Sequence, residues 1–219
     1  MMDKNLFNQL SDTNLKMPQG IFQVGASYGQ ELELFKEYGV QSCIMVEPLP
    51  EPFNYIANIC KNTPNHIAVN ALCSDVAGES VDFYIANNGG QSSSMLRPLN
   101  HLEIFKDVKF DSQIKLTTTT VDQICVMLVE AGHANIFNKI DTMYLDVQGA
   151  EFKVLLGSIK LLKSIKYIYF ELIRGDLYEK IPELSVFINF LGSLGFVLNN
   201  INYNQYHHAN VLFVNKDVI

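Results

Sequence analysis

Residues 21–30, IFQVGASYGQ, join a short apolar run to two glycines that bracket small residues. The ELELFKEYGV that follows has a helical pattern, so the stretch predicts a strand (20–24), a glycine turn and the start of a helix. Gly25 and Gly29 permit positive φ and carry no side chain that would block a close approach. The N–H groups at the start of the helix would then face a crevice. We expect a ligand there, although a plain strand-to-helix turn has the same pattern.

Short β-rich runs alternate with helical patterns along most of the chain. Strands are expected at 20–24, 42–47, 66–72, 142–147 and 166–172, and helices at 30–39, 49–62, 120–132 and 149–164. This alternation indicates a parallel, doubly wound sheet. The tail differs, because a helix at 182–195 precedes two consecutive strand-like runs (196–201 and 209–216). One of these two strands should therefore run antiparallel at the sheet edge.

The composition of the 219 residues limits the classes of function. A net charge of −7 without a block of Lys or Arg disfavours nucleic acid as a partner. The four cysteines lack Cys-x-x-Cys spacing, so we expect reduced thiols in a cytoplasm rather than structural zinc or disulfides. We expect no signal peptide, and no apolar run approaches the roughly 20 residues that span a bilayer. The composition is compatible with a homo-oligomer.

We expect one domain over residues 1–219, with a core at about 20–215 and an N-terminal extension at 1–19. One irregular segment, ANNGGQSSSMLRPLN (86–100), is rich in Gly, Asn and Ser, which predicts a mobile loop. It is either an ordinary surface loop or part of a lid over the ligand, and such a lid would extend over 86–118.

The second expected strand ends in Glu47 and Pro48, about 20 residues beyond the glycine turn. An acid at this place accepts hydrogen bonds from both hydroxyls of a ribose. An exposed Glu before a helix-starting proline has the same sequence. The turn and the acid together favour a ligand that contains adenosine.

Six segments follow one another as in FkbM-type S-adenosylmethionine-dependent methyltransferases, which this chain resembles over roughly residues 20 to 215. They are VGASYG, VEPLPEPFNYIANI, ALCSDVAGESVDFY, SSSML, TTVDQI and YLDVQGAEFKVLLG. The resemblance implies the α/β class I (Rossmann-like) methyltransferase fold, a doubly wound sheet of seven mostly parallel strands with an antiparallel C-terminal strand. It also implies S-adenosylmethionine as cofactor and methyl transfer to oxygen on a sugar, glycan or other small molecule.

The resemblance assigns cofactor-binding roles to several residues. They are Gly25, Ala26, Ser27 and Gly29 around the methionine part, Glu47 with Pro48 at the ribose, and Ser74 and Asp75 near the adenine. Ser92 and Ser93 match a serine-containing stretch of the family.

Two positions depart from the family pattern, because Gln23 stands where Asp is usual and Gln148 where Glu is usual. A carboxylate at position 23 would pair with the ammonium group of the cofactor. The carbonyl of Gln23 would keep part of that interaction, since hydrogen bonds to charged groups contribute roughly 1.5–3 kcal/mol. We therefore expect Gln23→Asp to bind the cofactor at least as tightly as the wild type.

Asp146 and Glu171 end two strands that the resemblance makes neighbours, and adjacent strands lie about 4.8 Å apart. Both carboxylates would stand beside the glycine turn. They would share a proton, orient an acceptor hydroxyl as catalytic groups, or bind a divalent cation such as Mg²⁺ or Mn²⁺. Asp146 would also lie at the cofactor. The alternative is that both only cap the following helices.

Five other side chains are weaker candidates for a role in the site. Glu151 lies in the first turn of its helix, where a carboxylate stabilises the helix dipole as readily as it would serve catalysis. His101 is expected at the surface rather than as a base over the site. His207 and His208 form a loop pair with a minor claim to metal binding. Tyr28 would face the sulfonium through a cation–π contact, or it is simply a buried aromatic residue.

Two other classes of function remain open. Glu47 suits any ribose, so a nicotinamide-dependent dehydrogenase is one alternative. Against it, the glycine spacing is not Gly-x-Gly-x-x-Gly, and the antiparallel tail does not fit. The other alternative is a non-catalytic binding module in which Gln23 has lost the cofactor.

Overall fold

The computed structural model describes residues 5–13, 15–173, 175–203 and 208–217. Its helices are α1 (Asn5–Asp12), α2 (Leu32–Glu37), α3 (Pro50–Lys61), α4 (His101–Ile104), α5 (Val121–Leu128), α6 (Glu151–Leu156), α7 (Ile159–Leu162) and α8 (Leu184–Gly192), with turns η1 (Val129–His133) and η2 (Ala134–Asn138). Its strands are β1 (Gly20–Val24), β2 (Ser42–Glu47), β3 (His66–Asn70), β4 (Leu72–Cys73), β5 (Ser80–Ile85), β6 (Ser112–Thr119), β7 (Thr142–Leu145), β8 (Tyr167–Ile173), β9 (Phe196–Tyr203) and β10 (His208–Asn215).

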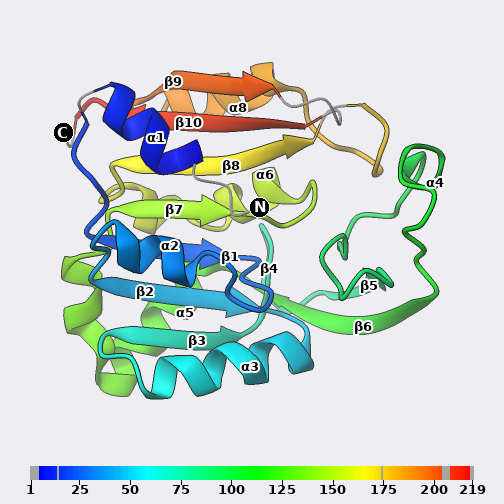
Figure 1. The fold of residues 1–219 in the computed structure, drawn as a ribbon, viewed down its shortest axis with the longest axis horizontal. Helices are drawn as coiled ribbons and strands as arrows, with labels where there is room; N and C mark the ends of the chain where they lie inside the picture. Colours follow the sequence, from blue (N-terminus) through cyan, green and yellow to red (C-terminus); the bar gives the residue numbers. More distant parts are fainter. Residues whose placement is uncertain (1–4, 14, 174, 204–207, 218–219) are drawn as a thin grey trace.

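Seven strands form one sheet in the order β3-β2-β1-β7-β8-β10-β9. Five of them, β3, β2, β1, β7 and β8, pair in parallel, and β10 pairs antiparallel with both neighbours. The predicted doubly wound class I fold and its antiparallel C-terminal strand are confirmed. The antiparallel strand is not at the edge as expected, because β10 inserts between β8 and β9 and leaves β9 outermost (Figure 1).

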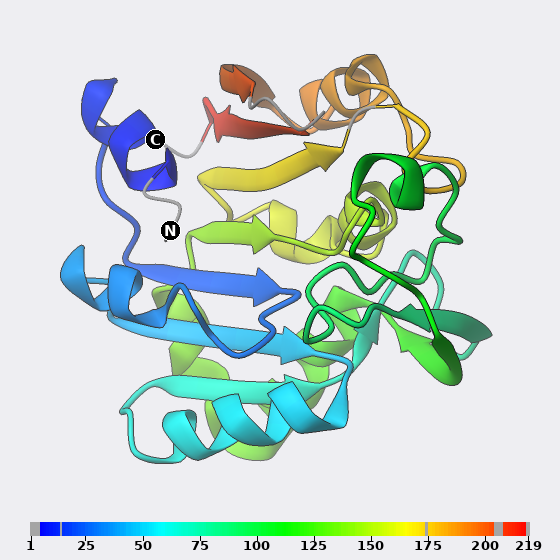
Figure 2. The same cartoon turned by 45° about the vertical axis from the view of Figure 1, so that its right-hand side comes forward.

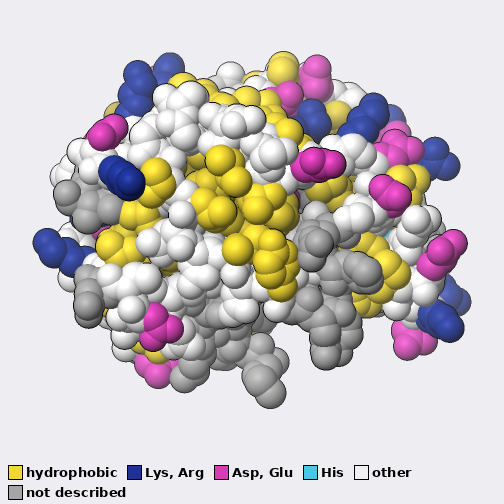
Figure 3. Space-filling view, turned by 90° about the horizontal axis from the view of Figure 1, so that it is seen from above, with side chains coloured by type: hydrophobic (Ala, Val, Ile, Leu, Met, Phe, Trp, Pro, Cys, Tyr) yellow, Lys and Arg dark blue, Asp and Glu magenta, His cyan; other side chains and the backbone are white. Residues whose placement is uncertain are grey.

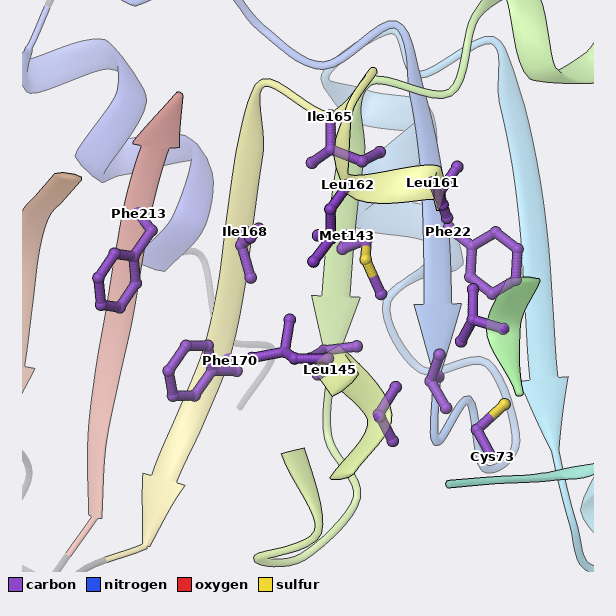
Figure 4. Packing of buried hydrophobic residues seen from close by; sticks show 14 of the residues in the cluster. Phe22, Cys73, Met143, Leu145, Leu161, Leu162, Ile165, Ile168, Phe170 and Phe213 are labelled. Atoms are coloured by element: carbon purple, nitrogen blue, oxygen red, sulfur yellow. The ribbon is translucent and has the colours of Figure 1, made fainter. Parts of the chain in front are cut away.

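Side-chain alternation along the strands gives the sheet two apolar faces. In β1, Phe22 and Val24 join the cluster covered by α5, α6, α7 and α8, whereas Ile21 joins the cluster covered by α1, α2 and α3. Figure 2 shows the two layers of helices on opposite sides of the sheet. In the first cluster, Leu145 of β7 and Phe170 of β8 lie side by side (Figure 4). Burial on both faces explains why the strands read as nearly continuous apolar runs.

Helix α1 belongs to the core rather than to a separate extension. Leu6, Phe7 and Leu10 are fully buried, and the Phe7 ring stacks on Tyr38 with centroids 4.4 Å apart. The apolar side of α1 completes one face of the sheet, so part of the expected N-terminal extension packs within the core.

One expected strand and one expected helix are each divided into two shorter elements. The strand expected at 66–72 ends at Asn70, and Leu72–Cys73 pairs instead with β6 in a small sheet of order β4-β6-β5. The helix expected at 149–164 divides at Gly157, where a Cβ atom would lie 2.1 Å from the carbonyl oxygen of Ser74. Asp122 accepts the N–H groups of Lys160 and Leu161 and so starts α7 separately.

The segment expected as a lid is only partly irregular. Strands β5 and β6 flank it, so residues 112–118 form a strand rather than a loop, and residues 101–104 form α4. Periodicity missed β5 and β6 because their burial is incomplete and mixed. The C-terminal ends of the parallel strands point toward this segment (Figure 1).

In the described part of the chain, no helix has the length and apolar character needed to cross a bilayer. On the face seen in Figure 3, Lys and Arg side chains lie mostly toward the periphery, interspersed with Asp and Glu.

Gly157→Ala should destabilise the fold by roughly 1–3 kcal/mol, because the added methyl group collides with the backbone of Ser74. Gly192→Ala is the matched control, since nothing lies within 4 Å of its added Cβ atom. That control should be neutral or stabilising by up to about 1 kcal/mol. Urea unfolding of both variants measures the difference, and equal stabilities would show that the contact at Gly157 relaxes without cost.

Glu151 fixes the loop between β7 and α6, because its Oε1 accepts the N–H groups of Val147 and Gly149. Burial raises the pKa of Glu151 to about 8 from an ordinary value of 4.5. Between these values the folded protein keeps a proton that the unfolded chain releases, so stability falls as pH rises through this window.

Glu151→Gln should remove much of that loss, because the amide oxygen still accepts both N–H groups and does not titrate. The stability of the variant should fall less steeply between about pH 5 and pH 8, by at most about 1.4 kcal/mol per pH unit. Urea unfolding at several pH values tests this, with the exposed Glu103→Gln as control. Identical pH slopes for all three proteins would contradict it.

Candidate functional site

A cavity of about 720 Å³ lies at the C-terminal ends of β1, β2, β7 and β8. The residues that line it are Val24, Gly25, Ser27, Gln30, Glu31, Glu47, Pro48, Leu49, Pro52, Ala71, Leu72, Cys73, Phe83, Asn88, Gly89, Gly90, Gln91, Ser92, Ser93, Met95, His101, Phe105, Val108, Tyr144, Leu145, Asp146, Val147, Gln148, Ala150, Tyr169, Glu171, His208 and Asn210. Its position, beyond the strand ends of an open α/β sheet, is where such folds bind ligands.

The glycine turn holds three strand ends together. Gly25 has a φ of +82°, and a Cβ atom there would lie 1.8 Å from the carbonyl oxygen of Asp146. The N–H groups of Gly25 and Ala26 donate to the carbonyl of Val46, and the N–H of Asp146 donates to Val24. Only glycine permits this approach, so the turn brings the tips of β1, β2 and β7 to one wall of the cavity.

Glu47 is held by backbone donors on both of its oxygens. Oε2 accepts the N–H of Ser27 at 2.8 Å, and Oε1 accepts the N–H of Leu49 at 2.9 Å. The residue is only 5% exposed, and burial raises its pKa while these two hydrogen bonds oppose the rise. The carboxylate is therefore oriented before any ligand arrives, and it retains acceptor capacity for further donors.

Gln23 does not line the cavity. Its side chain is fully buried, and its Nε2 donates to Oε2 of Glu31 at 2.9 Å. Glu31, which immediately precedes α2, lines the cavity instead. The expected direct contact of Gln23 with a ligand is not what the geometry indicates, because strand alternation turns Gln23 toward α2.

Half of the residues that the resemblance assigned to the cofactor reach the cavity. Those lining it are Gly25, Ser27, Glu47, Pro48 and Asp146; those outside its lining are Gln23, Ala26, Gly29, Ser74 and Asp75. Ser74 donates to Asp75, which also pairs with Lys153. The preceding residues 71–73 contact the cavity in their place.

Asp146 is a half-buried carboxylate at the cavity wall. Burial, and then the negative charge of Glu171, raise its pKa above the ordinary range. Its Oδ1 accepts a hydrogen bond of 2.7 Å from Nε2 of Gln148, which lowers the pKa. Gln148 thus orients Asp146 where a glutamate would repel it.

Glu171 forms a pair with His208 that sequence reasoning missed. Nδ1 of His208 lies 2.9 Å from Oε1 of Glu171, and both residues line the cavity. In the antiparallel register Asn210 is opposite Glu171, so His208 is its diagonal neighbour across β8 and β10. The prediction of His208 in a loop pair was wrong, because it starts β10; His207 lies outside the described residues. Only the strand register could have revealed this pair.

Among the described residues, no group of three or more His, Cys, Asp or Glu is arranged to hold a metal ion. One oxygen of each suggested carboxylate already has another partner, an amide donor at Asp146 and an imidazole at Glu171. The suggested Mg²⁺ or Mn²⁺ site therefore gains no support from the donor set.

The far end of the cavity is aromatic. His101 is 3% exposed rather than a surface residue as expected, and its ring lies 4.9 Å from Phe105 and 5.4 Å from Tyr178 between centroids. Burial and the nearby His208 lower its pKa. Tyr28 is outside the cavity lining and packs edge-on against Tyr55, so the suggested cation–π contact with a sulfonium gains no support.

The segment between β5 and α4 contributes to the cavity wall, and several hydrogen bonds fasten it, two of which involve residues beside the cavity. Ser94 Oγ donates to the carbonyl of Gln148 at 2.8 Å, and the hydroxyl of Tyr178 donates to the carbonyl of Ser92 at 2.7 Å. Ser92 and Ser93 line the cavity. The segment has the position of a lid, whereas its movement stays a prediction.

The Asp, Glu, Lys and Arg side chains among the described lining residues are all acidic. Four carboxylates line the cavity, those of Glu31, Glu47, Asp146 and Glu171, and none of the described lining residues is Lys or Arg. Such a site attracts a positively charged ligand and repels an anionic one.

Known proteins resemble this chain in sequence and in fold. A family model described as the methyltransferase FkbM domain matches residues 23–198. The 2-O-methyltransferase NoeI of Sinorhizobium fredii (strain NBRC 101917 / NGR234) is 33% identical over 123 residues, which are 53% of this chain and 48% of the relative. The match thus spans about half the length of this curated relative.

Solved structures also align with this chain, at low sequence identity. Magnesium protoporphyrin IX methyltransferase (ChlM) from Synechocystis PCC 6803 with bound SAM aligns with a TM-score of 0.52 and 8% identity, covering 98% of this chain and 77% of that chain. A SAM-dependent methyltransferase from Aquifex aeolicus has a TM-score of 0.47 and 10% identity over 96% of this chain and 89% of that chain. The first likeness shows the fold. Because the family model spans most of the sequence, the chain belongs to the FkbM methyltransferase domain family.

Proposed function

We propose that this protein transfers a methyl group from S-adenosylmethionine to a hydroxyl oxygen of a sugar, glycan or other small-molecule acceptor. The observation that carries the proposal is the anionic cavity at the ends of β1, β2 and β7, whose described lining contains four carboxylates and neither Lys nor Arg. Family membership and the name of the Sinorhizobium fredii relative, a 2-O-methyltransferase, support methyl transfer to oxygen.

The residues present fit a nucleoside with a cationic tail. Glu47 is buried and pre-oriented at the tip of β2, where a carboxylate accepts hydrogen bonds from ribose hydroxyls. Ala71, Leu72 and Cys73 add mostly apolar surface beside it for an adenine ring. Toward the other side of Gly25, the carboxylates of Glu31 and Asp146 suit positive charge.

The same charges oppose a dinucleotide. The pyrophosphate of NAD carries two negative charges and is normally bound by backbone N–H groups of a Gly-x-Gly-x-x-Gly turn. Here Glu47 occupies the N–H of Ser27 within the turn. We therefore place the dehydrogenase alternative below the methyltransferase.

We propose His208 as the base that takes the proton of the acceptor hydroxyl. When bound, S-adenosylmethionine supplies an electrophilic methyl group on a positively charged sulfur. In this proposal Glu171 holds the His208 tautomer with the proton on Nδ1, so the buried Nε2 carries the lone pair. As the oxygen–methyl bond forms and the carbon–sulfur bond breaks, the hydroxyl proton passes to Nε2, and Glu171 stabilises the imidazolium.

Asp146 has an electrostatic role in this proposal rather than the role of base. Its raised pKa reflects burial beside Glu171, and Gln148 already donates to one of its oxygens. A cation in the cavity would favour the ionised form of Asp146. Glu171 acts as a positioning residue, and no step requires a divalent cation.

The nucleic-acid exclusion, the cytoplasmic location, the single domain and a homo-oligomeric state stay predictions. The anionic cavity favours a neutral acceptor over a polyanionic one.

S-adenosylhomocysteine should bind the purified protein, and NAD should not. The reason is the charge of the cavity, which suits an amino group and repels a pyrophosphate. Isothermal titration of the same preparation with each ligand measures this. Binding of NAD without binding of S-adenosylhomocysteine would favour the dehydrogenase alternative. Binding of neither ligand would favour a non-catalytic module that has lost the cofactor.

His208→Gln should lower turnover by roughly 10²–10⁴-fold, the usual worth of general acid–base catalysis, with little change in affinity for S-adenosylhomocysteine. Glu171→Gln should lower turnover less and shift the pH profile of kcat, because the imidazolium loses its partner. The assay follows labelled methyl transfer to a panel of sugars with free hydroxyls. The exposed His133→Gln is the matched control. Full turnover by His208→Gln would exclude it as the base, and labelling restricted to amines would exclude the hydroxyl acceptor.

A further inference from the structure

Glu31 and Gln23 are joined by a hydrogen bond beside the cavity, and their arrangement suggests which of them contacts a ligand. Gln23 is fully buried on the α2 side of β1 and directs its amide N–H to Oε2 of Glu31 at 2.9 Å. Glu31 is half-buried and lines the cavity beside Gly25. The buried amide therefore fixes the position of a carboxylate that lines the cavity.

We propose that Glu31 binds the α-ammonium group of the S-adenosylmethionine amino-acid tail, and that Gln23 is the positioning residue that aims it. This inference rests on the proposed function and adds a specificity-determining residue to it. Glu47 marks the ribose end at the tip of β2, and Glu31 precedes α2 at the far side of the glycine turn. A nucleoside anchored at Glu47 would extend its tail past Gly25 toward Glu31.

Neighbouring charges agree with a cation at this end. The negative charge of Glu31 is one of the causes that raise the pKa of Asp146, so the two carboxylates interact across the cavity wall. An ammonium group near both would relieve their repulsion. None of the described lining residues is a Lys or Arg that would supply the positive charge instead.

The geometry also reverses the expectation for Gln23→Asp. Aspartate at position 23, one methylene shorter than Gln, would replace the amide donor to Oε2 of Glu31 with a like charge in a fully buried position, and one of the two groups would have to bind a proton or move. Cofactor binding should therefore weaken in Gln23→Asp. The double variant Gln23→Asp with Glu31→Gln removes this repulsion but leaves no carboxylate at position 31, so it should bind S-adenosylhomocysteine no more tightly than Glu31→Gln.

The test compares two ligands that share adenosine and differ in the amino-acid tail, S-adenosylhomocysteine and 5′-methylthioadenosine. Glu31→Gln should bind S-adenosylhomocysteine about 10- to 100-fold more weakly, the loss expected for a hydrogen bond to a charged group. Its affinity for 5′-methylthioadenosine should not change. Glu33→Gln, an exposed neighbour on α2, is the matched control and should bind both ligands like the wild type.

Each outcome separates this inference from the proposed function. Wild-type protein that binds neither ligand would contradict the proposed function itself. Wild-type binding of both ligands, with equal losses or no loss for both in Glu31→Gln, would overturn the role of Glu31 alone. If Glu31→Gln fails to fold by circular dichroism, Glu31→Asp keeps the charge on a shorter side chain. It should weaken S-adenosylhomocysteine selectively, and an unselective effect would overturn the inference.

Discussion

The close approach of Gly25 to the backbone of Asp146 is the constraint on which the site depends. A side chain at position 25 would occupy the space of the Asp146 carbonyl, so only glycine lets the ends of β1 and β7 meet. The same turn donates two N–H groups to Val46 at the end of β2. Three strand ends thus converge, and they place the carboxylates of Glu47 and Asp146 on one cavity wall. The helices that cover both faces of the sheet bury the strands that lead to this junction.

Four carboxylates make the cavity at this junction anionic. Glu31, Glu47, Asp146 and Glu171 are held by donors on the protein itself, namely a side-chain amide, backbone N–H groups, the Gln148 amide and the His208 imidazole. These partners orient the carboxylates without neutralising the cavity as a whole. An anionic site of this kind favours a cationic cofactor and a neutral acceptor, as the proposed methyl transfer from a sulfonium to a hydroxyl requires.

Periodicity and turn chemistry predicted the fold, the glycine turn and Glu47, because these are local features of the chain. Features that depend on pairing between distant segments were missed. His208 meets Glu171 only through the register of β8 and β10, and Glu31 meets Gln23 only because strand alternation turns Gln23 toward α2. Burial of His101 likewise depends on aromatic residues that come together in space. Composition alone could not locate these contacts.

A crystal structure of the protein with S-adenosylhomocysteine tests the account most directly. The account predicts the ribose hydroxyls at Glu47, the amino group at Glu31, and the sulfur between Asp146 and the His208–Glu171 pair. An acceptor hydroxyl would then have room at the aromatic end near His101. A ligand bound with its nucleoside away from Glu47, or with its amino group remote from every carboxylate of the cavity, would contradict the account.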